Sequence, residues 1–292
     1  MKKTLPWGYL AVIASACLYG CMPLLTKYIY AGGVNVLTTV LLRNLLAAPV
    51  LGVLAKLRGQ RLKVAPKACL SVSAVGVMGS CLTTIPLFAS YNYISSGAAT
   101  VLHFVYPALT VVAGILFLRQ RASLGTLLGV ALCMAGIAMF YDPGQSMDWR
   151  GVALALASGV AYTAYILLLA AFPYKEISGF LFSFWFSVSN SVLLLAVCLI
   201  GGQLQLPTTL VGWVLSLLLA LVTNVGAMVL FQQGARAIGS QRAAVLSALE
   251  PVVSVFVGWW VFAEIVGART LIGSALVLLA SIIIALFDAK KK

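Results

Sequence analysis

The sequence predicts an all-α integral membrane protein in which ten transmembrane helices form two inverted five-helix repeats, with both termini in the cytoplasm. Three observations support this prediction: the chain is strongly apolar, its two halves resemble each other, and its basic residues gather in alternate loops. Of the 292 residues, 62% are hydrophobic and 9% are charged, whereas about a quarter of a soluble domain is charged. Lipid is therefore expected to be the main solvent.

A window of about 19 residues, the length of a membrane-spanning helix, locates the apolar segments. Thr83, Thr84, Asn224 and Gln232 lower the hydropathy of the third and eighth segments. The predicted spans are 5–28, 36–55, 68–93, 97–118, 124–140, 151–172, 179–200, 210–233, 242–262 and 268–287.

The basic residues set the predicted orientation. If the N-terminus is cytoplasmic, both chain ends and the loops after the even-numbered spans face inside. That orientation leaves only Lys27, Arg43, Arg150 and Arg269 unassigned, and Arg43 lies within a span. The cytoplasmic basic residues would be Lys2, Lys3, Lys56, Arg58, Arg61, Lys63, Lys67, Arg119, Arg121, Lys175, Arg236, Arg242, Lys290, Lys291 and Lys292. The positive-inside rule therefore favours an even number of crossings.

The two halves of the chain are similar to each other. Residues 93–140 align without a gap on 237–284 at an offset of 144, which places Pro107 on Pro251. At an offset of 143, Tyr19 falls on Tyr162. We therefore divide the chain into two repeats, 5–140 and 151–287. Because each repeat has an odd number of spans, the second must enter the membrane from the opposite side, as in many transporters. A duplicated scaffold without a transport role is the alternative.

Three segments of the chain resemble a known family. They read LEPVVSVFVGWWVFAEIVGARTLIGSALVLLAS, its weaker copy VYPALTVVAGILFLRQRASLGTLLGVALCMAG, and LLRNLLAAP in the second span. These segments resemble the EamA-type branch of the drug/metabolite transporter superfamily, and the resemblance covers nearly the whole chain. It implies a ten-helix bundle around a central cavity. It also implies transport of amino acids and related metabolites outward, or of small organic solutes inward.

The two repeats differ in polarity. The first repeat has Gln120 where the second has the family-like Glu264, and Tyr106 where the second has Glu250. A site formed between the repeats should therefore be asymmetric.

Glu250 is the only acidic residue deep within a predicted span. A charge at that depth costs on the order of 2.5 to 3.5 kcal/mol on insertion scales. A substrate ammonium group or a proton could offset this cost, because burial favours the protonated form of a carboxyl group. Glu250 could then exchange a proton for a cationic solute. The alternative is a structural carboxyl group that bonds the backbone near Pro251.

Arg43 lies within the second span and needs an anionic or carbonyl partner. It could pair with Glu250 in the empty protein, or bind a substrate carboxylate while Glu250 takes the amine. Snorkelling towards the interface is the structural alternative.

Several further side chains are predicted to line the substrate site. His103, the only histidine, is followed by Tyr106, and it either lines the cavity or packs against a neighbouring carbonyl. Aromatic rings could favour aromatic or cationic solutes, although Tyr91 and Tyr93 near a helix end are more typical of an interfacial belt. The predicted substrate-binding residues are Glu250, Arg43, His103, Tyr19, Tyr106, Tyr162, Trp185 and Asn224.

Other function classes are disfavoured. No nucleotide-binding glycine loop precedes a helix, and no nucleophile and base pair is evident. The six cysteines lie in or beside apolar segments, which favours free thiols. The formal charge of +13 comes with no aromatic-interleaved basic patch, so nucleic acid is not an expected partner. No metal and no cofactor are predicted.

The sequence therefore predicts a multi-pass transporter of the bacterial inner membrane. Our first hypothesis is a secondary exporter of small organic metabolites, such as amino acids or amphipathic and cationic compounds, that works by alternating access with proton coupling at Glu250. The expected partners are a small-molecule substrate and the lipid bilayer, and the protein is a monomer or a homodimer. Import of a small organic cation is the second hypothesis, and a membrane-embedded enzyme or scaffold is the third.

Overall fold

A computed structural model of the protein describes residues 4–118, 123–139, 148–170, 177–238, 243 and 246–288. Every regular element within these ranges is helical. Some residues used in the sequence predictions lie outside them, namely Lys2, Lys3, Arg119, Gln120, Arg121, Lys175, Arg242, Lys290, Lys291 and Lys292.

The described helices divide between the two halves of the chain. The first half comprises α1 (Thr4–Gly20), α2 (Met22–Ala31), α3 (Val36–Leu57), α4 (Pro66–Gly76), η1 (Val77–Leu82), α5 (Thr83–Ser90), α6 (Ser96–His103), α7 (Tyr106–Leu118) and α8 (Leu124–Ala138). The second half comprises α9 (Trp149–Ala170), α10 (Gly179–Ile200), α11 (Leu210–Ala220), η2 (Leu221–Ala227), α12 (Met228–Ile238), α14 (Leu249–Phe262) and α15 (Ala268–Asp288). The segments η1 and η2 are π-helical.

Within the described residues, seven helical stretches are long and apolar enough to cross a membrane. They coincide with the predicted first to fourth and sixth to eighth spans. The predicted fifth, ninth and tenth spans coincide with shorter apolar helices, Leu127–Ala138, Leu249–Phe262 and Ala268–Ile284. The described part of the chain is thus all-helical, with several apolar helices of the length that a multi-pass membrane protein needs.

Proline explains why two of the predicted spans are not continuous helices. Pro107 has no N–H to donate to the carbonyl of His103, and there α6 ends and α7 begins. Pro251 likewise cannot donate to the carbonyl of Ser247, and α14 begins only at Leu249. These interruptions place the C-terminal end of α6 and the N-terminal end of α14 inside the bundle.

Polar and apolar residues are distributed as expected for a protein surrounded by lipid. Large apolar side chains face outward, including Phe117 (80% exposed) and Ile200 (89% exposed). Asn44 and Asn190 are fully buried. Because lipid does not compete for hydrogen bonds, these buried polar groups must find partners within the bundle.

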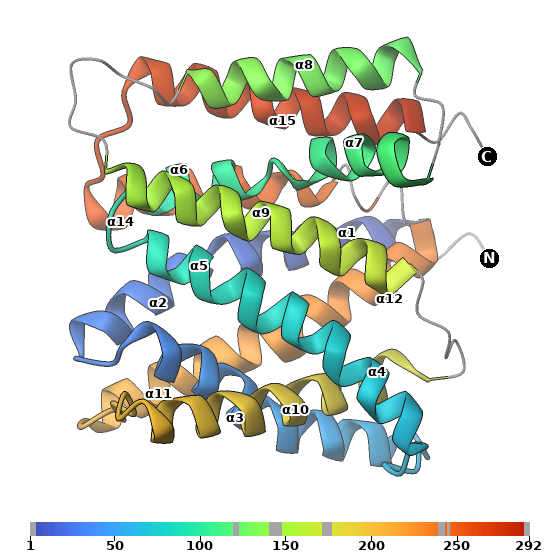
Figure 1. Cartoon of the computed structure of the whole chain (residues 1–292), viewed down its shortest axis with the longest axis vertical. Helices are drawn as coiled ribbons and strands as arrows, with labels where there is room; N and C mark the ends of the chain where they lie inside the picture. Colours follow the sequence, from blue (N-terminus) through green and yellow to red (C-terminus); the bar gives the residue numbers. More distant parts are fainter. Residues whose placement is uncertain are drawn as a thin grey trace.

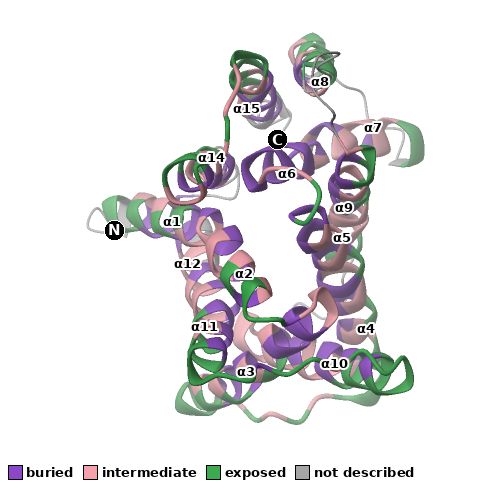
Figure 2. Cartoon of the chain, turned by 90° about the vertical axis from the view of Figure 1, so that its left-hand side faces the viewer, coloured by how far each residue is buried: buried purple, intermediate pink, exposed green. Residues whose placement is uncertain are grey.

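The helices form a bundle whose two sides each combine elements of both halves (Figures 1 and 2). On one side, α1 packs against α12 and α14, and α2 packs against α11. On the other side, α9 packs against α5, α6 and α7. The pair α3 and α10 closes one edge, and the pair α8 and α15 lies at the opposite edge. In Figure 1, α1 begins and α15 ends on the same side of the bundle.

The two π-helices occupy matching positions. η1 begins at Val77 and η2 at Leu221, 144 positions later. A serine from a neighbouring helix bonds a carbonyl at the end of each. Ser158 donates to the carbonyl of Thr83 (2.8 Å), and Ser15 donates to the carbonyl of Ala227 (2.7 Å). A π-turn disrupts the regular backbone ladder, and these serines satisfy carbonyls at that point.

Candidate functional site

Arg43 joins both halves of the chain from its position on α3. Its Nε donates to Asn224 Oδ1 (2.8 Å) and Thr223 Oγ1 (3.0 Å), both on η2. Its Nη1 donates to Thr84 Oγ1 on α5 (3.3 Å), and its guanidinium lies over the ring of Phe88, with Cζ 5.8 Å from the ring centroid. The charge of Arg43 is therefore held by neutral groups rather than by a carboxylate.

Asn44, the next residue on α3, lies between the two π-helices. Its Nδ2 donates to Ser80 Oγ on η1 (2.9 Å) and to the carbonyl of Val40 (2.8 Å). Its Oδ1 accepts a long bond from Asn224 Nδ2 (3.5 Å). Ser80 and Asn224, which are 144 positions apart, both bond this one asparagine. This network positions Asn224 and, through it, Arg43.

Glu250 lies in the first turn of α14 and is partly buried. It shares an electrostatic environment with Arg43 and with Tyr19, Tyr106 and Tyr162. Arg43 and Glu250, both among the described residues, do not form an ion pair within 4 Å. The direct pairing considered from the sequence is therefore absent from this structure, and each charge remains available to another group.

Unpaired atoms remain on both charged side chains. Within the described part of the chain, no acceptor reaches Nη2 of Arg43 and no donor reaches the carboxylate of Glu250. The only buried side-chain oxygen or nitrogen without a partner in those ranges is the hydroxyl of Tyr91. The unpaired atoms of Arg43 and Glu250 are not among such fully buried atoms, so the protein does not enclose them completely.

His103 is buried at the end of α6 and contacts both halves. Its Nδ1 lies 2.8 Å from Ser158 Oγ on α9. The single hydroxyl proton of Ser158 is donated to the carbonyl of Thr83, so Nδ1 of His103 is the donor in this contact. The neutral imidazole then keeps Nε2 as an acceptor, and its ring packs against Tyr106 and Tyr162.

Ser158→Ala is expected to lower the free energy of unfolding by about 1–3 kcal/mol, because it leaves the Thr83 carbonyl and the His103 Nδ1 unpaired. Ser15→Ala is the matched control. Ser15 makes a similar bond to the carbonyl of Ala227, and the residue 144 positions after His103 is Ser247, which has no imidazole. Thermal unfolding followed by tryptophan fluorescence measures both. An effect of Ser158→Ala no larger than that of Ser15→Ala would contradict the donor role assigned to His103.

Two of the tyrosines predicted from the sequence, Tyr106 and Tyr162, cluster on the α9 side, whereas Tyr19 lies on α1. Tyr106 and Tyr162 meet edge to face, with ring centroids 4.7 Å apart, and Tyr162 also packs against Tyr165 at 5.4 Å. Trp185 is placed differently. Its indole Nε1 donates to the carbonyl of Leu62, in the loop between α3 and α4, at 2.8 Å. The structure therefore gathers the predicted site residues except Trp185, which anchors a loop.

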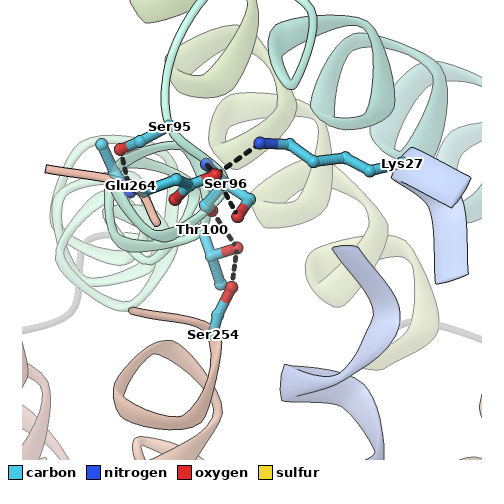
Figure 3. A network of polar contacts seen from close by, with 7 residues as sticks. Lys27, Ser95, Ser96, Thr100, Ser254 and Glu264 are labelled. Carbon is cyan, nitrogen blue, oxygen red and sulfur yellow. Dashed lines mark hydrogen bonds and ion pairs between the residues drawn. The ribbon is translucent and has the colours of Figure 1, made fainter. Parts of the chain in front are cut away.

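A second charged network, not predicted from the sequence, lies at the ends of α2 and α14 (Figure 3). Lys27 forms an ion pair with Glu264. The same carboxylate oxygen accepts from Ser96 N (3.1 Å) and Ser96 Oγ (2.9 Å) at the start of α6. Ala263 has a φ of 50°, and a Cβ on Gly258 would clash with Glu264 Oε2. The chain therefore turns sharply so that Glu264 can reach α2 and α6.

Tyr91 is a further residue that the sequence did not place in the site. It is 5% exposed, whereas Tyr93 is 42% exposed. The interfacial position expected for both does not fit Tyr91, which is buried, and for Tyr93 it stays a prediction. Tyr91 packs on Phe88, with ring centroids 5.8 Å apart, on the α5 side of Arg43.

Comparison with known proteins identifies related sequences. The model of the EamA-like transporter family matches residues 6–141 and again 149–286. A protein of Archaeoglobus fulgidus named "Uncharacterized transporter" is 26% identical over 204 residues, which is 70% of this chain and 72% of the relative. "Uncharacterized transporter YcbK" of Bacillus subtilis is 23% identical over 91% of this chain and 88% of its own length.

Two further likenesses agree with these. "Uncharacterized transporter sll1319" of Synechocystis is 30% identical over 60% of this chain and 54% of its own length. A protein of known crystal structure has the same fold, with a TM-score of 0.65 and 16% identity over 99% of both chains.

Proposed function

The chain belongs to the EamA-like transporter family, and we propose that it is a secondary exporter of amino acids or similar amphipathic metabolites. Membership makes it a membrane transporter rather than an enzyme. The observation that carries the substrate class is the separation of Arg43 from Glu250. Each has unpaired atoms that the described residues leave open. A zwitterion offers a carboxylate to Arg43 and an ammonium group to Glu250.

The transport mechanism in this proposal is alternating access by ten spans arranged as two inverted repeats. Several features support it: the π-helices lie 144 positions apart, the Ser15 and Ser158 bonds correspond, and the family model matches twice. Packing also corresponds, since α1 contacts α12 and α14 as α9 contacts α5 and α6. Rocking of the two sides of the bundle would expose Arg43 and Glu250 to each face in turn.

The Lys27–Glu264 network closes one end of the bundle in this proposal. It joins α2, α6 and the segment after α14, so these elements must separate when that end opens. The hydroxyl groups of Thr100 on α6 and Ser254 on α14 also contact each other (3.0 Å), which adds a contact between these two helices (Figure 3). By the positive-inside rule this end faces away from the cytoplasm.

Glu264→Gln is expected to favour opening at this end, because the neutral amide cannot form an ion pair with Lys27. Ser254, which is fully buried, can be replaced by cysteine in a background without the six native cysteines. An impermeant thiol reagent should then label it about tenfold faster, the change produced by a shift of about 1.4 kcal/mol. Lys27→Arg preserves the ion pair and serves as the control. Equal labelling rates with and without the Glu264→Gln substitution would refute the closure assigned to this network.

Proton exchange at Glu250 is the proposed driving reaction. A proton and a substrate ammonium group would compete for the same carboxylate, so binding of one releases the other. The proposal places the protein in a bacterial inner membrane with both termini in the cytoplasm, as a monomer or a homodimer.

Import of a small organic cation is the second candidate. It is favoured by the rings of Tyr19, Tyr106 and Tyr162, which share the electrostatic environment of Glu250. Aromatic faces attract cations that have lost their water, and quaternary ammonium groups in particular. Such a solute would leave Arg43 without a ligand.

Purified protein in liposomes tests the proposal. Counterflow of a radiolabelled L-amino acid is expected, and the same amino acid should raise the thermal unfolding temperature because it binds the folded state. Counterflow of choline, without any response to the twenty common L-amino acids, would favour the second candidate instead. An absence of flux for both classes would refute the substrate assignment.

A further inference from the structure

The hydroxyl group of Tyr91 is buried and unpaired. Tyr91 lies at the end of α5, and its ring packs on Phe88, whose face bears the guanidinium of Arg43. It is the only buried side-chain oxygen or nitrogen in the described ranges that has no hydrogen-bond partner. Leaving a buried hydroxyl unpaired destabilises the folded state, so such a group calls for an explanation, and a ligand that supplies the missing partner is one.

Neighbouring protein groups do not supply the missing partner. Thr100 lies near the Tyr91 hydroxyl, but no contact with hydrogen-bond geometry joins them. The Thr100 hydroxyl already donates to the carbonyl of Ser96 (2.9 Å) and contacts Ser254 Oγ (Figure 3). The electrostatic neighbours of Tyr91 are instead Arg43, Glu250 and Glu264. The hydroxyl therefore lies within electrostatic range of both charges of the proposed site.

We propose that the Tyr91 hydroxyl donates a hydrogen bond to the carboxylate of the solute held by Arg43, and so helps determine specificity for that group. A phenolic O–H bonds an anion more strongly than a neutral acceptor. Phe88 lies beside both donors. The Cζ atom of Arg43 is 5.8 Å from the centroid of the Phe88 ring, and the ring centroid of Tyr91 is also 5.8 Å from it. This inference rests on the proposed function, and it adds a ligand to the same site.

Tyr91→Phe removes the oxygen and keeps the ring against Phe88, so it separates binding from packing. Without ligand, the variant should unfold at the same temperature as the wild type or at a higher one, because an unpaired hydroxyl has been removed. The dissociation constant of whichever of the twenty common L-amino acids binds the wild type should rise about 10- to 100-fold, as expected for a bond to a charged group. The decarboxylated amine of the same amino acid should bind both proteins equally. Tyr93→Phe makes the same chemical change at an exposed position and should change neither property.

The outcomes are distinguishable. If no amino acid binds the wild type, the proposed function fails, and this inference fails with it. If an amino acid binds the wild type and Tyr91→Phe equally, the role of Tyr91 is refuted while the site at Arg43 stands. A lower unfolding temperature of ligand-free Tyr91→Phe would show that the hydroxyl has a structural partner, and equal weakening of the amine would refute the bond to the carboxylate.

Discussion

Replacing Arg43 with methionine is expected to reduce amino-acid counterflow by at least about 30-fold. Methionine preserves much of the length of the side chain but removes the charge that would bind the substrate carboxylate. Losing one partner of a hydrogen-bonded charge pair in a low-dielectric environment costs about 2–5 kcal/mol, and 1.4 kcal/mol corresponds to a factor of ten. Counterflow in liposomes and ligand-induced thermal shifts both measure this change.

Two control variants separate substrate binding from the support of Arg43 by its neighbours. Arg43→Lys keeps the charge but cannot present two parallel donors, so it should weaken the amino acid while retaining measurable transport. Thr84→Val removes only the 3.3 Å bond to Nη1 and should have the smallest effect. An Arg43→Met protein that folds and transports at the wild-type rate would remove Arg43 from the site.

Hydropathy and the 144-residue offset between similar segments show how much of the fold could be predicted from sequence. Hydropathy located the apolar segments, and the offset of 144 aligned Pro107 with Pro251. Each of these prolines leaves the carbonyl four residues earlier, that of His103 or Ser247, without a helical donor. The π-helices were not predictable in this way. They depend on hydroxyl groups from other helices, namely Ser158 at Thr83 and Ser15 at Ala227, and such contacts exist only after the helices have packed.

The candidate site was predictable to the extent that its residues are unusual in a membrane. Arg43 and Glu250 could be identified because ionisable side chains within spans are rare. Their partners could not. Thr84 and Thr223 reach Arg43 from separate helices, and hydroxyl groups of this kind are common within apolar segments. The absence of an Arg43–Glu250 ion pair could not be predicted either, because it depends on how the helices pack and not only on how far along its span each residue lies.

Residues near the ends of spans were the hardest to interpret. Lys27 and Glu264 each lie near a helix end, where a charge is ordinary, so only the fold shows that they pair. Tyr91 has the same ambiguity, because a tyrosine at a helix end is typical of the membrane interface, yet it is covered in the bundle. Trp185 differs in the opposite way. It was expected in the substrate site, but its indole Nε1 donates to the carbonyl of Leu62 in a loop.

Glu250→Gln is expected to abolish accumulation of solute driven by a pH gradient. If one proton exchanges for one solute, a gradient of one pH unit, about 1.36 kcal/mol, sustains a solute gradient of about tenfold. On the acidic side the proton displaces the substrate ammonium group from the carboxylate, so the wild type should accumulate solute there. Glutamine has a similar shape but binds no proton in this range, and the ratio across the membrane should fall to about one.

Residual exchange distinguishes lost coupling from lost folding. Counterflow by Glu250→Gln, measured at saturating amino acid with equal pH on both sides, should be slower than wild type and insensitive to the pH at which it is measured. Glu250→Asp keeps a carboxyl group, so it should still couple flux to the gradient, with weaker binding because its shorter side chain reaches less far from α14. A Glu250→Gln protein that still builds a tenfold gradient would assign the proton to another group. His103 would be the first candidate, because its Nε2 remains an acceptor beside Tyr106 and Tyr162.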